Sequence, residues 1–223
     1  MTVGFLFIDG PDPWARVCAD GLVRSVRTVM PGVPVVQFSD PVTPAITAVT
    51  EVRRLPQESA SMAVMRFRHQ ANVTGDWLFL DTDIVVQKDV RKVFHSVFHI
   101  AVTTRNWPHL KAAEGFTERM PFNTGVIFSR SQKFWQEALE ILESSETHDR
   151  DFMGHQQIIC DLVASGRYEI AYVKGSKYNC PPFVEGGKEG GDPDLSAKMV
   201  KHAAIVHYKG QERKRLQQEV ACA

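Results

Sequence analysis

The feature of this sequence that most restricts its fold is a regular alternation of short apolar runs with longer amphipathic stretches. Residues 3–8 (VGFLFI) and 33–40 (VPVVQFSD) are rich in residue types that favour buried strands. The stretch between them, 11–32, predicts a helix that is capped by Asp12 and ended by Pro31-Gly32. The chain therefore begins with a strand, a helix and a second strand.

The same alternation continues through the rest of the chain. The sequence predicts further strands over 77–86, 99–105 and 122–129, and helices over 59–75, 131–144 and 154–165. Strands that alternate with helices form a sheet with helices on its faces. We therefore expect an α/β fold in which a mixed, mostly parallel sheet is flanked by helices.

Length and composition agree with one globular domain. The chain has 223 residues, of which 43% are hydrophobic and 23% charged, and this is enough to bury a substantial core. Lys plus Arg equals Asp plus Glu at 26 each, so no overall field attracts nucleic acid, and we expect none as a partner. The basic C-terminal residues 211–223 are predicted as a helix that is either a peripheral membrane contact or a solvated surface.

The cysteines and the N-terminus bear on the compartment. The 4 cysteines are scattered and form no CxxC pair, which indicates a reducing environment. The first residues, MTVGFLFIDG, have neither the basic segment nor the long apolar segment of a secretion signal. No apolar stretch is long enough to span a bilayer. Together these observations predict a cytoplasmic protein.

The run 77–86 (WLFLDTDIVV) carries two carboxylates among apolar, strand-favouring residues. Side chains alternate along a strand, so Asp81 and Asp83 are expected to point to one side and Thr82 to the other. Two like charges that converge where the chain leaves a hydrophobic layer need a cation or hydrogen-bond donors between them. Two interpretations follow: a divalent cation held by carboxylate oxygens, or a turn whose Asp side chains cap backbone donors.

Three stretches, in the same order along the chain, resemble motifs of nucleotide-sugar glycosyltransferases with the A-type fold. GDWLFLDTDIVVQKDV resembles their metal-binding strand, FNTGVIFSR resembles the FNxGVxxxN strand of glycosyltransferase family 8, and IVHYKGQERK resembles that family's HxxGxxKPW element, without its Pro-Trp. Family 8 is the retaining group that contains glycogenin and bacterial lipopolysaccharide galactosyltransferases. The resemblance implies a single-domain A-type glycosyltransferase fold and transfer of a hexose from a UDP-sugar to an acceptor hydroxyl, with retention of configuration.

The resemblance implies that Asp81, Asp83 and His207 are metal ligands, with Mn²⁺ or Mg²⁺ as the cofactor. Two carboxylates and a neutral imidazole leave positions open for two diphosphate oxygens on an octahedral ion. Thr82 and Gly210 belong to the same elements and are assigned with them to the nucleotide-sugar site. Arg213 falls where the family has a lysine that contacts the diphosphate, and Lys214 follows it.

Other residues are implied to contact the sugar. Arg66 matches an arginine on the helix before the metal strand that reaches the donor sugar or diphosphate, and Arg68 is a competing choice. Asn123 matches an asparagine that hydrogen-bonds the donor sugar or the acceptor. Gly125 would let a substrate approach the backbone.

The nucleotide is assigned to the first loop, FIDGPDPWA. Its acidic residues Asp9 and Asp12 are candidates for contacts to the base or ribose. Trp14 offers a face on which the base could stack, or it packs into the core of the first helix.

The residues implied in catalysis are Gln156, Asp83 and Arg66. Gln156 aligns with a glutamine beneath the sugar, within a DQD triplet that reads His155-Gln156-Gln157 here. Attack on the face from which the leaving group departs would leave Gln156 nearest to the anomeric carbon. Attack from the opposite face would require a carboxylate base, for which Asp149 and Asp151 are candidates.

The resemblance also suggests a division of labour along the chain. Residues 1–105 would bind the nucleotide and the metal. Residues 106–210 would bind the sugar and the acceptor, whose hydroxyl belongs to a carbohydrate, a lipid-linked molecule or a protein. Segments 106–120 and 185–194 are predicted as mobile loops that act as lids. The altered triplet leaves open a non-catalytic relative that binds a nucleotide sugar or carbohydrate. A nucleotidyltransferase fits less well, because the first loop is not basic.

Overall fold

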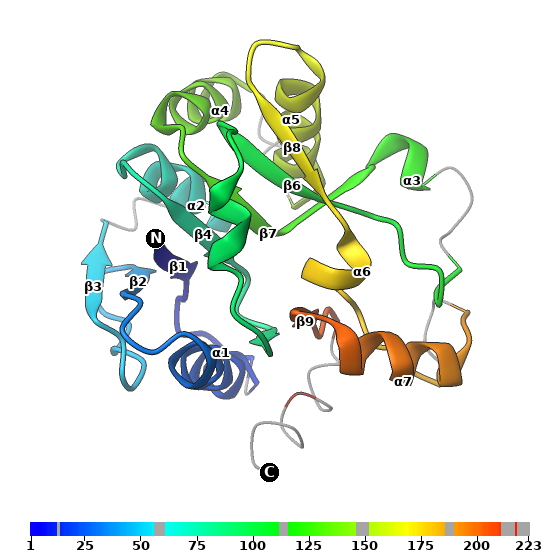
Figure 1. Ribbon diagram of the computed structural model, residues 1–223. Coiled ribbons are helices and arrows are strands. Elements are labelled where there is room, and N and C mark those ends of the chain that lie inside the picture. Colours follow the sequence, from blue (N-terminus) through cyan, green and yellow to red (C-terminus); the bar gives the residue numbers. More distant parts are fainter. Residues whose placement is uncertain are drawn as a thin grey trace.

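The computed structural model of the protein describes residues 1–12, 14–55, 61–111, 116–145, 152–185, 190–210 and 217. A seven-stranded sheet in the order β3-β2-β1-β4-β7-β6-β8 forms its centre (Figure 1). In chain order these strands are β1 (Thr2–Leu6), β2 (Val35–Ser39), β3 (Glu51–Arg54), β4 (Trp77–Leu80), β6 (Ile100–Thr104), β7 (Phe122–Ser129) and β8 (Ile170–Val173). Within this sheet β7 alone runs antiparallel to its neighbours. The expected mixed, mostly parallel sheet is therefore confirmed.

Helices cover both faces of the sheet. The helices of the described residues are α1 (Ala15–Val29), α2 (Met62–Ala71), α3 (Phe116–Arg119), α4 (Gln132–Ser144), α5 (Phe152–Ala164), α6 (Gly175–Tyr178) and α7 (Pro193–His202), with a 3-10 turn η1 (Arg91–His95). The apolar stripe of α1 packs into one hydrophobic core, while α2, α4 and α5 pack into a second core on the opposite face (Figure 1). The result is the three-layer arrangement that alternating strands and helices predict.

The alternation of side chains in β4 explains why two cores exist. Leu78 and Leu80 belong to the core beneath α1, whereas Trp77 and Phe79 belong to the core beneath α2, α4 and α5. All four are at most 5% exposed. A strand buried on both faces reads as a continuous apolar run, which is what residues 77–80 show.

A second, two-stranded sheet lies next to the end of β4. Its strands β5 (Ile84–Val86) and β9 (Ile205–His207) pair antiparallel. The prediction of one unbroken strand over 77–86 was therefore wrong, because the chain turns at residues 81–83 between β4 and β5. This turn lets a single sequence run contribute to both sheets.

The elements that were not predicted include the two edge strands and helix α7, besides η1, α3 and α6. The edge strand β3 has the sequence EVRR and is half-exposed, and the side chains of the edge strand β8 are also partly exposed. Because each strand is short and lies at an edge, neither carries the long apolar run that marks a buried strand. Helix α7 begins inside the segment 185–194 that was predicted as a loop. Its start is marked by Asp192, whose side chain accepts a hydrogen bond from the Leu195 N–H at 3.0 Å, and by Pro193.

The predicted helix boundaries were partly right. Helix α1 ends before Pro31-Gly32 as expected, but it begins at Ala15, and Trp14 occupies the N-cap position without a side-chain cap. The Asp12 carboxylate instead accepts a hydrogen bond from the Trp14 N–H at 3.0 Å, one step ahead of the helix. Helix α2 begins later than predicted, at Met62, because Ser61 caps it.

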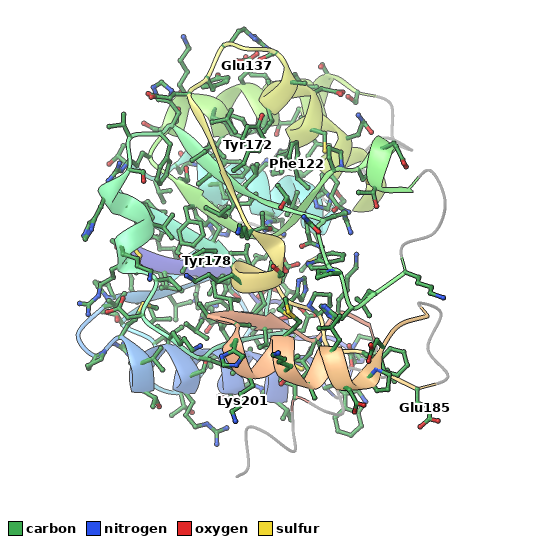
Figure 2. All side chains as sticks on the ribbon, turned by 45° about the vertical axis from the view of Figure 1, so that its right-hand side comes forward. Phe122, Glu137, Tyr172, Tyr178, Glu185 and Lys201 are labelled. Atoms are coloured by element: carbon green, nitrogen blue, oxygen red, sulfur yellow. The ribbon has the colours of Figure 1, made fainter. Side chains whose placement is uncertain are left out.

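Short α6 and longer α7 differ in how they meet the rest of the molecule. Tyr178 of α6 lies inside, where its ring meets Phe128 edge-on at 6.0 Å, whereas Lys201 of α7 lies at the surface (Figure 2). Cys18, Cys160 and Cys180 are buried, and burial raises the pKa of Cys180 to about 12. Within the described parts of the chain no helix has the length and apolar character needed to cross a membrane.

Candidate metal centre

The turn that carries Asp81 and Asp83 is held at both ends by neighbouring backbone. The Asp81 N–H donates to the Gly125 carbonyl in β7 at 2.9 Å, and the Tyr208 N–H donates to the Asp83 carbonyl at 2.7 Å. Ile84 stands opposite His207 in the β5–β9 pair. The pairing of β5 with β9 therefore carries His207 to the two carboxylates.

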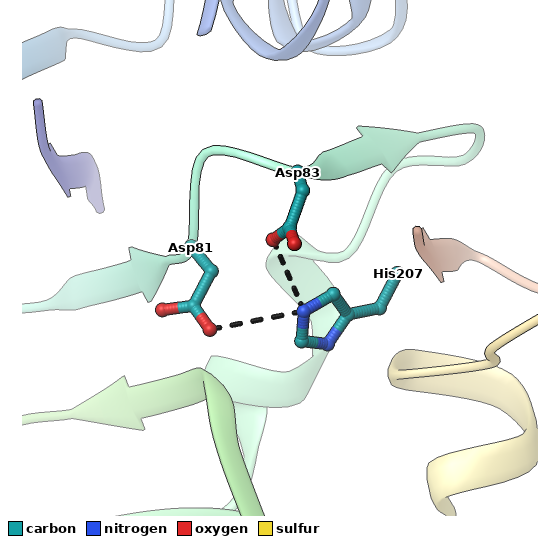
Figure 3. A group of neighbouring side chains, drawn as sticks. All are labelled: Asp81, Asp83 and His207. Atoms are coloured by element: carbon teal, nitrogen blue, oxygen red, sulfur yellow. Dashed lines mark ion pairs between the residues drawn. The ribbon is translucent and has the colours of Figure 1, made fainter. Parts of the chain in front are cut away.

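The three predicted ligands converge on one point (Figure 3). His207 Nε2 lies 3.1 Å from Asp83 Oδ1 and 3.7 Å from Asp81 Oδ2. One ligand atom from each of the three residues fits within 4.8 Å of the others. The side chain of His207 is 4% exposed, whereas those of Asp83 and Asp81 are 14% and 26% exposed. The carboxylates thus face the open side of the cluster.

This donor set suits a hard divalent cation. Ligands of Mg²⁺ lie at about 2.1 Å, so adjacent ligands are about 3 Å apart and opposite ligands about 4.2 Å apart. The separations from His207 Nε2 to the carboxylates, 3.1 and 3.7 Å, fall in that range. Two carboxylate oxygens and one imidazole nitrogen also leave coordination positions for a ligand. The residues present therefore fit Mn²⁺ or Mg²⁺.

Gly125 makes room for the cluster. A Cβ at this position would stand 2.4 Å from His207 Cε1 and 2.8 Å from Asp81 Oδ2. The sequence suggested that Gly125 admits a substrate to the backbone, but the groups that approach it are the two ligand side chains.

Arg66 and Arg68 lead in different directions from α2. Arg66 Nη1 donates to Asp81 Oδ1 at 2.7 Å, and its Nη2 donates to the Thr124 carbonyl at 2.6 Å. This leaves Asp81 Oδ2 as the oxygen that faces His207. Arg68 pairs with Glu143 of α4 at the surface instead. Of the two arginines considered from the sequence, Arg66 is the one that contacts a predicted metal ligand.

A cleft of about 250 Å³ opens beside the three ligands. Its lining residues come from the ends of β1 and β4, from the turn and from two helices: Leu6, Met62, Ala63, Arg66, Leu80, Asp81, Thr82, Asp83 and His155. Ligand crevices in open α/β sheets lie at the carboxyl ends of the strands, and this cleft has that position. Leu6, Met62, Ala63 and Leu80 make part of its lining apolar, whereas Arg66, Asp81 and Asp83 contribute charged groups.

The first loop continues from Leu6, which lines the cleft. Beyond it the Asp9 N–H donates to Thr43 Oγ1 at 2.9 Å, and the Asp9 carboxylate lies 3.9 Å from Arg16. Asp9 is exposed, while Asp12 and Trp14 are half-buried.

Asn123 and Gln156 are buried, and both have defined partners. Asn123 Oδ1 accepts hydrogen bonds from the Gly125 N–H and from Asn179 Nδ2, each at 2.9 Å. Gln156 Oε1 accepts from Arg105 Nη2 at 2.8 Å, while the Gln156 Nε2 is buried without a hydrogen-bond partner among the described residues. A buried amide of this kind is suited to meet a polar ligand.

The other members of the triplet diverge. His155 is 4% exposed and lines the cleft. Gln157 lies at the surface, where its amide donates to Asp161 at 2.8 Å. The third position of the triplet therefore faces away from the cleft.

The two segments predicted as lids contact each other. Leu110 bridges to Gly191, the Lys111 N–H donates to the Gly190 carbonyl at 2.8 Å, and the Asp192 N–H donates to the His109 carbonyl at 3.0 Å. Segments far apart in sequence are thus joined through their backbones.

Sequence reasoning missed Asn179, which contacts both His207 and Asn123. It follows α6 in the stretch KYNC, which carries no motif by which it could have been found. Gly210 has φ of 90° and is exposed. Arg213, Lys214, Asp149 and Asp151 lie outside the described residues.

Comparison with solved structures identifies the fold. A glycosyltransferase involved in the glycosylation of the major capsid of PBCV-1 is 13% identical with a TM-score of 0.62, and the alignment covers 100% of both chains. The glycosyltransferase GlyE of Streptococcus pneumoniae TIGR4 is 16% identical with a TM-score of 0.64, over 100% of this chain and 60% of GlyE. The galactosyltransferase LgtC, solved with donor and acceptor sugar analogs, is 14% identical with a TM-score of 0.62, over 100% and 95% of the two chains.

These likenesses, together with the sheet order, show that the chain has the A-type fold of nucleotide-sugar glycosyltransferases. No protein-family model and no curated protein matches the sequence.

Proposed function

We propose that this protein is a metal-dependent glycosyltransferase that transfers a hexose from a UDP-sugar to an acceptor hydroxyl, with retention of configuration. The observation that carries the proposal is the convergence of Asp81, Asp83 and His207 beside a cleft, at the strand ends of an A-type glycosyltransferase fold.

Asp81, Asp83 and His207 would hold Mn²⁺ or Mg²⁺ at the mouth of the cleft. Such an ion acts as a Lewis acid that offsets the negative charge developing on the departing diphosphate. Arg66 lies 2.7 Å from Asp81 and supplies a second positive charge at the same place. Thr82, in the turn, and Gly210, beyond His207, are proposed to flank the diphosphate, and Arg213 is proposed to join them.

The nucleotide would lie along the first loop. Asp9 and Asp12 are proposed to contact the base or ribose, and Trp14 to stack on the base. Two apolar residues of the cleft lining, Leu6 and Leu80, end the strands that lead into this loop and into the proposed metal ligands. Residues 1–105 would then bind nucleotide and metal.

The sugar would extend toward α5 and β7, within residues 106–210. The Gln156 Nε2, which has no hydrogen-bond partner in the described part of the chain, is the group that we assign to the sugar, with His155 on the wall of the cleft. Asn123 offers its remaining hydrogen-bonding capacity to the sugar or acceptor. The paired segments around Leu110 and Gly191 would shield the site from water, which otherwise competes with the acceptor.

The acceptor is proposed to be a hydroxyl of a carbohydrate, a lipid-linked molecule or a protein. Residues 211–223 are proposed to contact a membrane surface if the acceptor is lipid-linked. Nucleic acid is not proposed as a partner.

The test is the thermal midpoint of the purified protein with UDP, GDP, ADP and CDP, each with and without Mn²⁺. A ligand that binds only the folded protein raises the midpoint, because it stabilises the folded state by about 2.7 kcal/mol when its concentration is 100 times its dissociation constant. We expect a rise confined to UDP with Mn²⁺, followed by turnover of a UDP-sugar. No rise with any nucleotide would contradict the proposed donor site.

Two other outcomes would change the function rather than the site. UDP binding with Mn²⁺ but no turnover or hydrolysis of any UDP-sugar would identify a non-catalytic nucleotide-sugar-binding protein. Release of pyrophosphate from a nucleoside triphosphate would identify a nucleotidyltransferase.

A further inference from the structure

We propose that Asn179 is a positioning residue that fixes the His207 ring for metal binding, through a relay of hydrogen bonds that starts at the backbone of Gly125. The proposal rests on the metal role proposed above for His207. Asn179 would touch neither the metal nor the substrate and would act through His207.

The relay has three links, all buried. The Gly125 N–H donates to Asn123 Oδ1 at 2.9 Å. Asn179 Nδ2 donates to the same oxygen at 2.9 Å. Asn179 Oδ1 lies 2.8 Å from His207 Nδ1. Asn179 is 0% exposed, and Asn123 and His207 are each 3% exposed, so water does not compete for these groups.

The direction of every link follows from the first one. A backbone N–H can only donate, so the Asn123 side-chain atom that meets Gly125 must be its oxygen. An oxygen there requires that Asn179 present its NH₂ group to it. The other atom of the Asn179 amide, which faces His207, is then oxygen, and His207 Nδ1 must carry the hydrogen.

Thr103 gives an independent check on the orientation of Asn179. Its Oγ1 donates to the Asn123 carbonyl at 2.9 Å, and therefore it can only accept from Asn179 Nδ2, which lies 2.7 Å away. Two neighbours of Asn179 thus demand the same amide orientation.

A hydrogen on Nδ1 decides what the other ring nitrogen can do. In a neutral imidazole with Nδ1 protonated, Nε2 presents its lone pair. In His207 this nitrogen faces Asp81 Oδ2 at 3.7 Å and Asp83 Oδ1 at 3.1 Å. Asn179 therefore fixes both the tautomer and the ring orientation that a metal ligand requires.

Asn179 itself is held by backbone contacts. It follows α6, and its N–H donates to the Gly175 carbonyl at 2.8 Å. A Cβ on Gly175 would stand 1.8 Å from the Thr104 carbonyl oxygen, so the glycine lets α6 lie directly against β6. The carbonyl of the next residue, Cys180, accepts a hydrogen bond from the His207 N–H at 3.0 Å. This frame fixes the distance between Asn179 and His207.

The test compares Asn179→Leu with Asn179→Asp. Both variants lose the NH₂ group that contacts Thr103 and Asn123, but only Asp keeps an oxygen that can accept from His207 Nδ1–H. Because outer-shell partners of metal ligands contribute about 10–100-fold to metal affinity, we expect Asn179→Leu to weaken Mn²⁺ binding at least about tenfold. We expect Asn179→Asp to remain within about threefold of the wild type. Titration of Mn²⁺ alone, followed by the free-ion electron paramagnetic resonance signal, measures both.

A merely structural role predicts equal losses of Mn²⁺ affinity in the two variants. That result, or an unchanged affinity in Asn179→Leu, would overturn the proposal. Thermal unfolding of both variants measures how far any loss of Mn²⁺ affinity accompanies destabilisation of the fold.

A second measurement needs no metal and no variant. In ¹⁵N-histidine-labelled wild type, the His207 ring should give a proton resonance on Nδ1 that exchanges slowly with water. Absence of that resonance overturns the relay even if the protein binds Mn²⁺. Conversely, a wild type that shows the resonance but binds no Mn²⁺ contradicts the proposed function and leaves the relay standing.

Discussion

The two sides of the candidate metal centre are built in different ways. On the carboxylate side, Asp81 and Asp83 come from one short turn, their side chains remain 26% and 14% exposed, and Arg66 pairs with Asp81. On the imidazole side, the side chain of His207 is 4% exposed and is held by Asn179 at the end of α6, which in turn contacts Asn123 of β7. One side is local and open, and the other is assembled from distant segments and closed.

Under the proposed function this difference would divide the tasks of the centre. The open carboxylates would attract the ion by their charge and could adjust to it and to its diphosphate. The buried imidazole, held by the uncharged amide of Asn179, would fix where that ion sits, as a rigid support fixes the geometry of a binding site.

The largest expected effect belongs to the carboxylate side. Asp83→Asn removes a ligand charge, and since even outer-shell partners contribute about 10–100-fold, Mn²⁺-dependent UDP binding should fall by more than about 100-fold. The matched control is Asp89→Asn, which removes the same charge from an exposed carboxylate paired with Arg91. The thermal midpoint with UDP and Mn²⁺ measures both, and a normal shift in Asp83→Asn would exclude Asp83 as a ligand.

Gly125→Ala tests the place where both sides meet. The new Cβ would lie 2.4 Å from His207 Cε1 and 2.8 Å from Asp81 Oδ2, so both ligands must move. Overpacking of this kind costs about 1–3 kcal/mol of stability, and we expect Mn²⁺ affinity to fall about 30-fold through displaced ligands. Gly10→Ala, whose Cβ would meet nothing within 4 Å, is the control. Wild-type affinity in Gly125→Ala would show that the imidazole side is less rigid than its burial indicates.

The same contrast explains how much could be predicted from the sequence. The spacing of Asp81 and Asp83 inside an apolar run predicted that the two carboxylates converge, and they do, although the chain turns there instead of continuing as a strand. The spacing left a cation and a capping turn as alternatives, and the family resemblance favoured the cation. Strand β7 was predicted at its observed bounds, Phe122–Ser129, because it is long and buried. Local patterns of this strength persist in the fold.

The imidazole side could not be predicted in the same way. The position of Asn179 depends on the close approach of α6 to β6 at Gly175, and therefore on a packing contact that no local pattern encodes. The edge strand β3 was missed for a related reason, since its EVRR sequence pairs with β2 through its backbone while its side chains stay half-exposed. His207 was assigned only through the family resemblance.

A smaller effect is expected for Arg66→Gln. Arg66 donates to Asp81 at 2.7 Å and to the Thr124 carbonyl at 2.6 Å, and the substitution removes a cation from the proposed diphosphate position. A hydrogen bond to a charged group contributes about 1.5 kcal/mol, so UDP affinity at saturating Mn²⁺ should fall about tenfold. The affinity for Mn²⁺ in the absence of UDP should not fall below that of the wild type, because the substitution removes a positive charge that repels the ion.

Arg68→Gln is the matched control for Arg66→Gln. Arg68 lies on the same helix, but its partner is Glu143 at the surface, and exposed pairs contribute little. We expect UDP affinity within about twofold of the wild type in this variant. Calorimetric titration of UDP distinguishes the two, and equal losses would contradict a role for Arg66 that depends on its place beside Asp81.

The smallest expected effect lies at Thr103, which contacts the relay from the side at Asn179. Thr103→Val removes the hydroxyl that accepts from Asn179 Nδ2 at 2.7 Å, but Asn179 keeps its bond to Asn123 Oδ1. Because the buried Asn179 amide loses one of these two partners, stability should fall by about 1 kcal/mol and Mn²⁺ affinity only about threefold. Thr104→Val is the matched control, because its hydroxyl bonds the Val173 carbonyl on β8 at 3.4 Å and has no link to Asn179. If Thr103→Val weakened Mn²⁺ as strongly as Asn179→Leu, the orientation of Asn179 would depend on the hydroxyl of Thr103 rather than on the backbone of Gly125, and the rigid side of the centre would begin at β6 instead of β7.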